Sequence, residues 1–130
     1  MFERKPLYTS YFGNSSKLRK EGIAIVSIAR FNPKYMTDLA GWCLSVAPRA
    51  EMLRMSEEKY EREFLKILND VDPGEIYHKV MEKAEGFDGV ALCCYEKDIN
   101  DCHRKTVGEW LTANGYACEE FGKSKQLKLF

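Results

Sequence analysis

The sequence predicts a single α/β domain in which a largely parallel, open sheet is flanked by helices. The chain has 130 residues, a length that usually forms one core, so residues 1–130 are expected to be one domain. Two nearly unbroken apolar runs, at residues 22–30 and 89–95, are typical of strands buried on both faces of a parallel sheet. Segments with helical periodicity separate these runs, and strands that alternate with helices indicate βαβ units.

The N-terminal half contains one clear strand. Residues 7–12 are short and aromatic and form either a strand or an ordered arm, and a turn composition follows them at residues 13–16. The run at residues 22–30 is rich in β-branched side chains, which favours a strand. Residues 33–55 have a roughly helical spacing of apolar side chains, which Pro48 interrupts.

The C-terminal half begins with two capped helices. Ser56 is a good N-cap for an amphipathic helix, and Asp72 is the expected cap of a second helix that Pro73 opens. A third helix is expected from about Asp101 to Gly115. Three more segments have the composition of strands: residues 89–95, 116–121 and 126–130. Together these elements predict the layers of Rossmann-like and flavodoxin-like domains.

The composition excludes several classes of protein. Lys and Arg number 20 and so do Asp and Glu, a balance unlike that of a protein that coats nucleic acid. The sequence contains neither a signal-peptide pattern nor an apolar stretch of about 20 residues, so we expect a cytoplasmic protein without a membrane span. The five cysteines form no CxxC pair, and we therefore expect reduced thiols rather than a disulfide framework.

Polar side chains follow both predicted buried strands. Ser27 and Arg30 end the first strand, and Cys94 and Glu96 end the second. Ligands of open α/β sheets bind beyond the carboxyl ends of the strands, where these groups meet if the two strands are parallel neighbours. Alternation along the strand places Cys94 and Glu96 on one side and Cys93 on the other.

The third helix is expected to begin with Cys102, His103 and Arg104 in its first turn. The free N–H groups and the dipole of a first turn favour negative charge, so Cys102 there should be partly thiolate. The same turn could instead bind a phosphate or carboxylate through its N–H groups and Arg104. The structural alternative to ligand binding by Arg104 is an ion pair with Glu96 or Asp101.

Most other cysteines and histidines have simpler explanations. Cys93, Cys43 and Cys118 are expected to be small core residues, and His78 a solvated or packing residue of a helix. Zinc ligation by Cys94, Cys102 and His103 must be weighed as well. Adjacent Cys102 and His103 point about 100° apart on a helix. This geometry, and the missing CxxC pair, favour a site without metal or cofactor.

Several of these motifs occur together in one known family. The sequence resembles the domain-of-unknown-function family 488, and the most specific part of the resemblance is the pair of tripeptides CYE and CHR followed by EWL. The remaining matching residues are Tyr8, Thr9, Ser10, Asn14, Ser27, Arg30, Ala47 and Pro48. The resemblance implies a small cytoplasmic α/β domain and carries no activity over. It also implies that Thr9, Ser10, Ser27 and Arg30 share a pocket with the CHR turn.

The leading hypothesis is a pocket that binds or acts on a small anionic ligand, such as a nucleotide or a nucleic-acid component. Arg30, Arg104 and the helix N-terminus would hold the anion, with Thr9, Ser10, Ser27 and Cys94 lining the site. Cys102 would be the nucleophile, and His103 or Glu96 would transfer protons. The residues leave open whether the protein is an enzyme, and they do not address its oligomeric state.

Two alternatives stay open. One is a binding module for nucleic acid or a protein, which would use an aromatic arm and nearby basic residues. These residues are Tyr8, Tyr11, Phe12, Lys17, Arg19, Lys20, Lys123, Lys125 and Lys128. The other is a zinc-binding domain that uses Cys94, Cys102 and His103.

Overall fold

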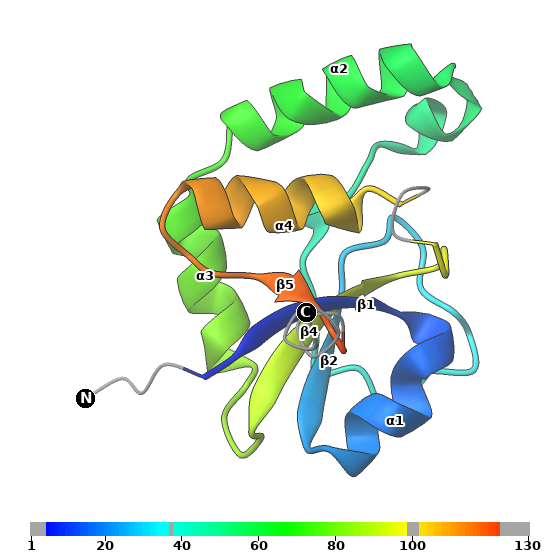
Figure 1. Ribbon diagram of the computed structural model, residues 1–130. Helices are drawn as coiled ribbons and strands as arrows, with labels where there is room; N and C mark the ends of the chain where they lie inside the picture. The colour runs from blue at the N-terminus through cyan, green and yellow to red at the C-terminus, as the bar shows by residue number, and fades with distance from the viewer. Residues whose placement is uncertain (1–4, 37, 99–101, 123–130) are drawn as a thin grey trace, which may run out of the picture.

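The computed structural model describes residues 5–36, 38–98 and 102–122. In this part of the chain, five parallel strands form one sheet in the order β3-β2-β4-β1-β5 (Figure 1). The strands are β1 (Leu7–Tyr11), β2 (Ile23–Ser27), β3 (Gly41–Trp42), β4 (Gly89–Cys94) and β5 (Glu119–Glu120). The predicted α/β domain with a parallel sheet and flanking helices is therefore confirmed.

Four α-helices and three short 3₁₀ helices connect the strands within the described residues. They are η1 (Phe12–Asn14), α1 (Ser15–Lys20), η2 (Leu44–Val46), η3 (Ala50–Arg54), α2 (Glu57–Asn69), α3 (Pro73–Glu82) and α4 (Arg104–Ala113). None of the helices in this part of the chain combines the length and the apolar composition that crossing a membrane requires.

The sheet has a buried layer on each face. On one face, α3 and α4 pack against the side chains that alternate along β2 and β4, such as Val26 and Leu92, and α2 adds Phe64 and Leu68 to the same buried cluster. On the other face, α1 contributes the fully buried Leu18, which packs with Ile25 and Cys93. Figure 1 shows α3 and α4 on one side of the sheet and α1 on the other. Cys93 is thus a core residue, as the sequence predicts.

The two predicted helix caps are confirmed. The Ser56 side chain accepts a hydrogen bond from the backbone N–H of Lys59, and the Asp72 carboxylate accepts one from the N–H of Gly74. Both bonds satisfy N–H groups that have no partner inside the helix. Pro73 occupies the first position of α3, where its missing N–H costs nothing.

Two predicted elements are wrong in extent, and the helical spacing noted in residues 33–55 does not produce an α-helix among the described residues. That part of the segment contains the short strand β3 and the 3₁₀ helices η2 and η3. Residues 116–121 contribute only the two-residue strand β5. The helix expected from Asp101 begins at Arg104, and the predicted strand at 126–130 lies outside the described residues.

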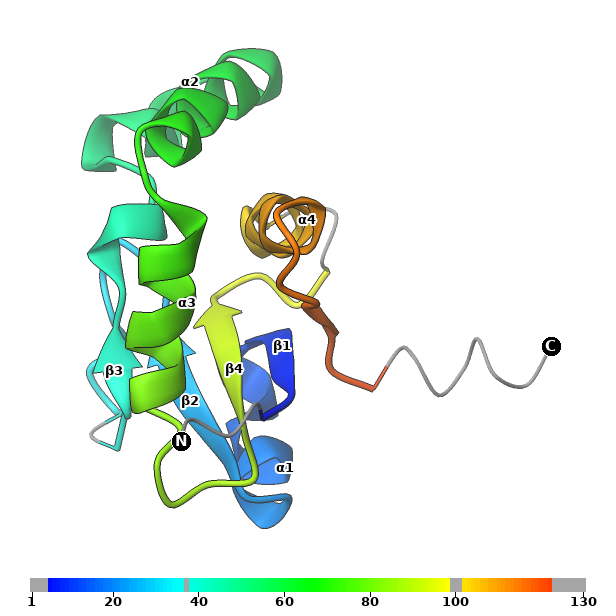
Figure 2. The same ribbon diagram turned by 90° about the vertical axis from the view of Figure 1, so that its left-hand side faces the viewer.

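The central pair of strands brings two polar segments together. β2 and β4 are parallel neighbours in which Ser27 is opposite Cys93, and the backbone N–H of Ile28 donates to the Cys93 carbonyl at 3.0 Å. Their carboxyl ends therefore lie side by side, as the hypothesis of a shared pocket requires. Figure 2 shows the strand arrows pointing toward the end of the sheet over which α2 lies.

Candidate functional site

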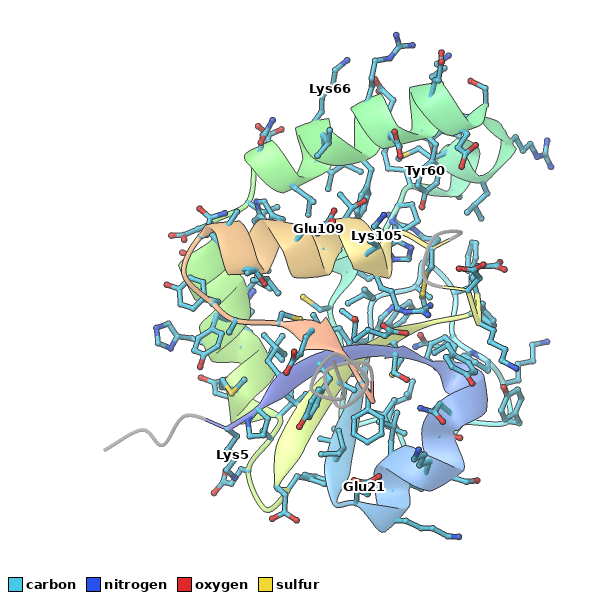
Figure 3. The ribbon with its side chains drawn as sticks, viewed as in Figure 1. Lys5, Glu21, Tyr60, Lys66, Lys105 and Glu109 are labelled. Carbon is cyan, nitrogen blue, oxygen red and sulfur yellow. A yellow bond between two sulfur atoms is a disulfide. The ribbon has the colours of Figure 1, made fainter. Side chains whose placement is uncertain are left out.

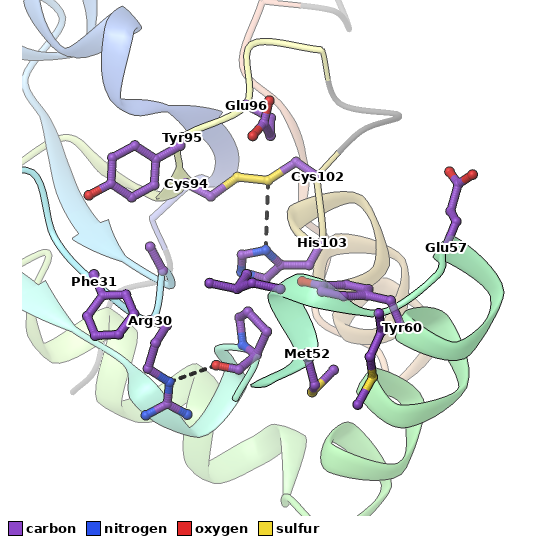
Figure 4. A pocket seen from close by; sticks show the side chains of 14 residues that line it. Arg30, Phe31, Met52, Glu57, Tyr60, Cys94, Tyr95, Glu96, Cys102 and His103 are labelled. Atoms are coloured by element: carbon purple, nitrogen blue, oxygen red, sulfur yellow. Dashed lines mark hydrogen bonds between the residues drawn. A yellow bond between two sulfur atoms is a disulfide. The ribbon is translucent and has the colours of Figure 1, made fainter. Parts of the chain in front are cut away.

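A cavity of about 370 Å³ lies at the carboxyl ends of β2 and β4 (Figure 4). Its walls come from the residues that follow both strands, from η3 and from the first turns of α2. Five of the predicted site residues line it: Arg30, Cys94, Glu96, Cys102 and His103. Cavities at this position of an α/β sheet are the usual ligand sites of such domains.

A disulfide joins Cys94, the last residue of β4, to Cys102. The expectation of reduced thiols is therefore wrong for this pair, although Cys43, Cys93 and Cys118 are free. The physical reason is the late start of α4. Because Cys102 precedes this helix instead of belonging to its first turn, the chain brings the Cys102 sulfur back to the end of β4.

His103 is held in one orientation beside this disulfide. Its Nε2 lies 2.6 Å from the carbonyl oxygen of Ile28, and because a carbonyl can only accept, Nε2 carries the proton. Burial lowers the pKa of His103 to about 4, and the nearby Arg104 charge acts in the same direction. The ring is therefore neutral near pH 7, and its unprotonated Nδ1 faces the Cys102 sulfur at 3.9 Å.

Packing supports the same orientation of the imidazole. The Phe64 ring of α2 is almost completely buried and meets the His103 ring edge to face, with centroids 5.2 Å apart. Edge-to-face contacts restrict the rotation of both rings because the attraction depends on their relative angle. His103 is thus positioned from one side by the backbone after β2 and from the other by α2.

Arg104 has internal partners on every side. It is fully buried, and its guanidinium binds the Glu120 carboxylate through Nε at 3.0 Å and Nη2 at 2.9 Å. It also donates to the carbonyl oxygens of Glu96 and Lys97 and to the Cys94 sulfur at 3.4 Å. The structure therefore gives Arg104 a structural part, which ties the segment after β4 to β5, in place of the predicted contact with a ligand.

The three predicted hydroxyl residues do not line the cavity. Thr9, Ser10 and Ser27 are all buried inside the sheet layer. Thr9 donates to the Glu120 carboxylate at 2.7 Å, and Ser27 donates to the side-chain oxygen of Asn32. Because their hydrogen bonds are made within the protein, these residues support the strand ends rather than a ligand.

Arg30 is the cation of the cavity wall. Its Nε donates to the Pro48 carbonyl at 2.8 Å, its two terminal nitrogens make no hydrogen bond to the described residues, and its charge acts on the nearby Glu51 carboxylate. In Figure 4, Arg30 lies at one edge of the cavity and the Cys94–Cys102 disulfide at the other. The Glu96 side chain is exposed beside the disulfide.

The sequence reasoning missed the aromatic part of this cavity. Phe31 and Tyr95 line it with large exposed fractions, 59% and 50%, and Tyr60 contributes from α2. Figure 3 shows Tyr60 on the side of α2 that faces α4, and burial raises its pKa to about 12. The sequence contained a signal for two of these rings, because Phe31 and Tyr95 directly follow Arg30 and Cys94, which were already predicted to belong to the site.

A metal could be held by the residues that the zinc alternative names. The ligand atoms of Cys94, Cys102 and His103 all lie within 4.8 Å of one another. The objection from helical geometry is wrong, because Cys102 and His103 precede α4 and their side chains converge. The Nε2 bond of His103 to a carbonyl is also the usual outer-shell arrangement of a histidine that binds zinc. Reduction of the disulfide must come first, since zinc binds thiolates.

The predicted aromatic arm is part of the sheet layer. Phe12 is buried, Tyr8 packs against the ring of Phe121 with centroids 5.0 Å apart, and Arg104 lies over the Tyr11 ring. The arm is therefore not a free platform for stacking bases. Of the basic residues, Arg19 pairs with Asp38. The predicted basic tail lies outside the described residues: Lys123, Lys125 and Lys128.

Comparison with known proteins identifies the family. The family model described as "Active DUF488-N3 subclade" matches residues 7–115. No curated protein and no solved structure matches the chain. The matched residues include both strand ends, the cavity and all of α4. The protein therefore belongs to the DUF488 family, the domain-of-unknown-function family 488 that its CYE and CHR motifs resemble.

Proposed function

We propose that this protein is a thiol-dependent enzyme in which reduced Cys102 attacks a small anionic substrate, such as a nucleotide or a nucleic-acid component, bound in the cavity. One observation carries the proposal: Nδ1 of His103 faces Cys102 while Nε2–H is fixed on the Ile28 carbonyl. A nucleophile, a base and a group that orients the base are the parts of a catalytic triad. The matching subclade is also described as active, which fits an enzyme.

In the reduced protein, Cys102 would give its proton to Nδ1 of His103. A histidine with a pKa of about 4 is a weak base, so a standing ion pair is disfavoured. A developing thiolate 3.9 Å away would stabilise the imidazolium, so the proton moves to Nδ1 as the sulfur attacks. Glu96, exposed beside the disulfide, would exchange protons between the cavity and solvent.

The cavity wall suggests which ligands fit. Arg30 offers two terminal nitrogens that could bind a phosphate or carboxylate in a bidentate way. The exposed rings of Phe31 and Tyr95 could take the face of a base, a contact worth about 1–3 kcal/mol per base. Carboxylates of Glu57 and Glu96 also lie at the cavity, so we place the anionic end of the ligand at Arg30.

Protection from alkylation tests the proposal. Trypsin releases Cys102 in a peptide of residues 98–104 that contains no other cysteine, so its labelling by iodoacetamide can be followed alone by mass spectrometry. The fully reduced protein is labelled with EDTA present, alone and with a nucleoside 5′-monophosphate, the free nucleoside or inorganic phosphate. We expect the nucleotide to slow labelling of Cys102 most.

Arg30→Gln should weaken this protection by about tenfold to a hundredfold, since a hydrogen bond to a charged group contributes about 1.5–3 kcal/mol. Arg62→Gln is the matched control, because Arg62 is an exposed arginine of α2 outside the cavity. Protection that is equal in both variants, or absent at millimolar nucleotide, contradicts the assigned ligand site. Protection of a Cys102 that reacts no faster than a free thiol indicates the binding module instead. Labelling that is slower in a parallel sample without EDTA indicates a zinc-bound thiolate.

A further inference from the structure

The cysteine that bonds to Cys102 has no part in the proposed attack on substrate. Cys94 is almost completely buried at the end of β4, with 2% of its surface exposed, whereas Cys102 is 9% exposed at the cavity. The adjacent Cys93 points to the opposite face of the sheet, where burial raises its pKa to about 12. Both paired cysteines therefore line the cavity, and Cys102 is the more exposed of the two.

We propose that Cys94 and Cys102 form a reversible redox pair, in which a hydroperoxide oxidises Cys102 and Cys94 then closes the disulfide, and that this closure switches the site off. The inference rests on the proposed function, because it assigns a means of regulation to the same nucleophile. The disulfide itself, located between the cavity and the end of β4, is the observation that carries it.

The oxidation takes two steps. In the first, the Cys102 sulfur attacks one oxygen of the hydroperoxide, the O–O bond breaks, and the leaving oxygen takes the thiol proton by way of His103. The products are a sulfenic acid on Cys102 and water or an alcohol. In the second, the Cys94 sulfur attacks the sulfenic sulfur, an S–S bond forms, and hydroxide leaves as water with the Cys94 proton. Two thiols lose two electrons, and the hydroperoxide gains them.

The surroundings of Cys94 suit the second step. The Arg104 guanidinium donates an N–H to the Cys94 sulfur at 3.4 Å, and a cation beside a thiol favours the attacking thiolate. Arg104 is itself held by the Glu120 carboxylate, so this donor stays in place. A small dithiol would reverse the reaction, since it gives two electrons and two protons to the disulfide and becomes a disulfide itself.

Closure of the disulfide blocks the reaction at Cys102 but leaves the ligand cavity intact. The Cys102 sulfur has no thiol proton to give to His103 and cannot act as a nucleophile while it is bonded to Cys94. The cavity and Arg30 remain in place in the disulfide form. The oxidised protein should therefore bind the same ligands as the reduced protein but should not react at Cys102.

Peptide mapping tests the pair directly. Trypsin cuts after Lys83, Lys97 and Arg104, so a Cys94–Cys102 bond links the peptides of residues 84–97 and 98–104. Reduced protein is treated with one equivalent of hydrogen peroxide, blocked with iodoacetamide, and digested. We expect the linked pair as the main product, its loss on treatment with a dithiol, and the return of alkylation at Cys102.

Two variants make the assignment specific. Because the peptide 84–97 contains both Cys93 and Cys94, Cys93→Ala should keep the linked pair and Cys94→Ser should lose it. In Cys94→Ser, peroxide should leave Cys102 as sulfenic or sulfinic acid. Linkage to Cys93, Cys43 or Cys118 overturns the proposal, and so does overoxidation of Cys102 in the wild type to the extent seen in Cys94→Ser.

The outcomes separate this inference from the proposed function. Cys94→Ser retains Cys102 and His103, so the alkylation of its Cys102 should still be slowed by a second substitution, His103→Gln, as it is in the reduced wild type. If reduced Cys102 is alkylated quickly but peroxide produces no linked peptides, the redox pair is rejected and the nucleophile is retained. If the linked peptides form but the alkylation of reduced Cys102 is slow and insensitive to His103→Gln, the nucleophile is rejected. The protein then has a redox pair without the proposed function.

Discussion

Replacement of His103 by glutamine should change how the stability of the protein depends on pH. Burial holds the folded-state pKa of His103 at about 4, against 6.5 for an exposed histidine. Between these values the unfolded chain binds a proton that the folded protein does not bind. The contribution of His103 to stability is therefore complete above pH 6.5 and is lost as the pH falls through this window toward 4.

The size of the effect follows from the difference between the two pKa values. At about 1.4 kcal/mol for each tenfold change, the free energy of unfolding of the wild type should fall by about 3 kcal/mol from this group alone. His103→Gln removes the titration, yet its amide N–H can still donate to the Ile28 carbonyl. The pH-dependent loss should therefore be smaller in the variant by about this amount.

Urea unfolding of the disulfide form between pH 4 and pH 7, followed by circular dichroism, measures the difference between wild type and variant. His78→Gln is the control for the loss of a histidine as such, because His78 lies exposed on α3. It should follow the wild type. Equal pH dependence in wild type and His103→Gln refutes a neutral, buried His103, and with it the assignment of Nδ1 as a proton acceptor.

Two further predictions concern the packing around the site. Arg104→Met should destabilise the protein by about 3–5 kcal/mol, because it leaves the mostly buried Glu120 carboxylate without its cation. Urea unfolding measures this loss, and a loss no greater than that in Arg19→Met, which breaks an exposed ion pair, contradicts the prediction. Phe64→Ala should cost about 3–5 kcal/mol by leaving a cavity and should also release the His103 ring. The ring resonances of His103 in NMR spectra report that release, and unchanged shifts would show that Phe64 does not position it.

Strands and caps could be read from the sequence because local chemistry decides them. The apolar runs at residues 22–30 and 89–95 favour strands that are buried on both faces, and in the structure they form neighbouring strands of the sheet. The hydroxyl of Ser56 precedes a strongly amphipathic segment, and it caps the helix as predicted. Short segments were harder, since residues 33–55 have apolar side chains at helical spacing but also prolines that break a helix.

The candidate site was predictable in its residues more than in their roles. Ligands bind at the carboxyl ends of parallel strands, and this rule predicted that Arg30, Glu96 and Cys102 share one site. All three line the same cavity in the structure. Long-range contacts decided what the pattern could not show. Arg104 reaches the Glu120 carboxylate from the other end of α4, and the start of α4 at Arg104 lets Cys102 return to Cys94.

The rate of alkylation of Cys102 in the reduced protein tests the central claim, that His103 acts as the base for a nucleophilic thiol. Iodoacetamide labelling of the peptide of residues 98–104 is followed from pH 6 to pH 9 in the wild type and in His103→Gln, with glutathione as the reference thiol. We predict that Cys102 reacts faster than glutathione near pH 7 and that His103→Gln slows it by about a hundredfold, the usual size of general base catalysis. A wild-type rate no faster than that of glutathione, unchanged by His103→Gln, would show that Cys102 is not a nucleophile activated by His103.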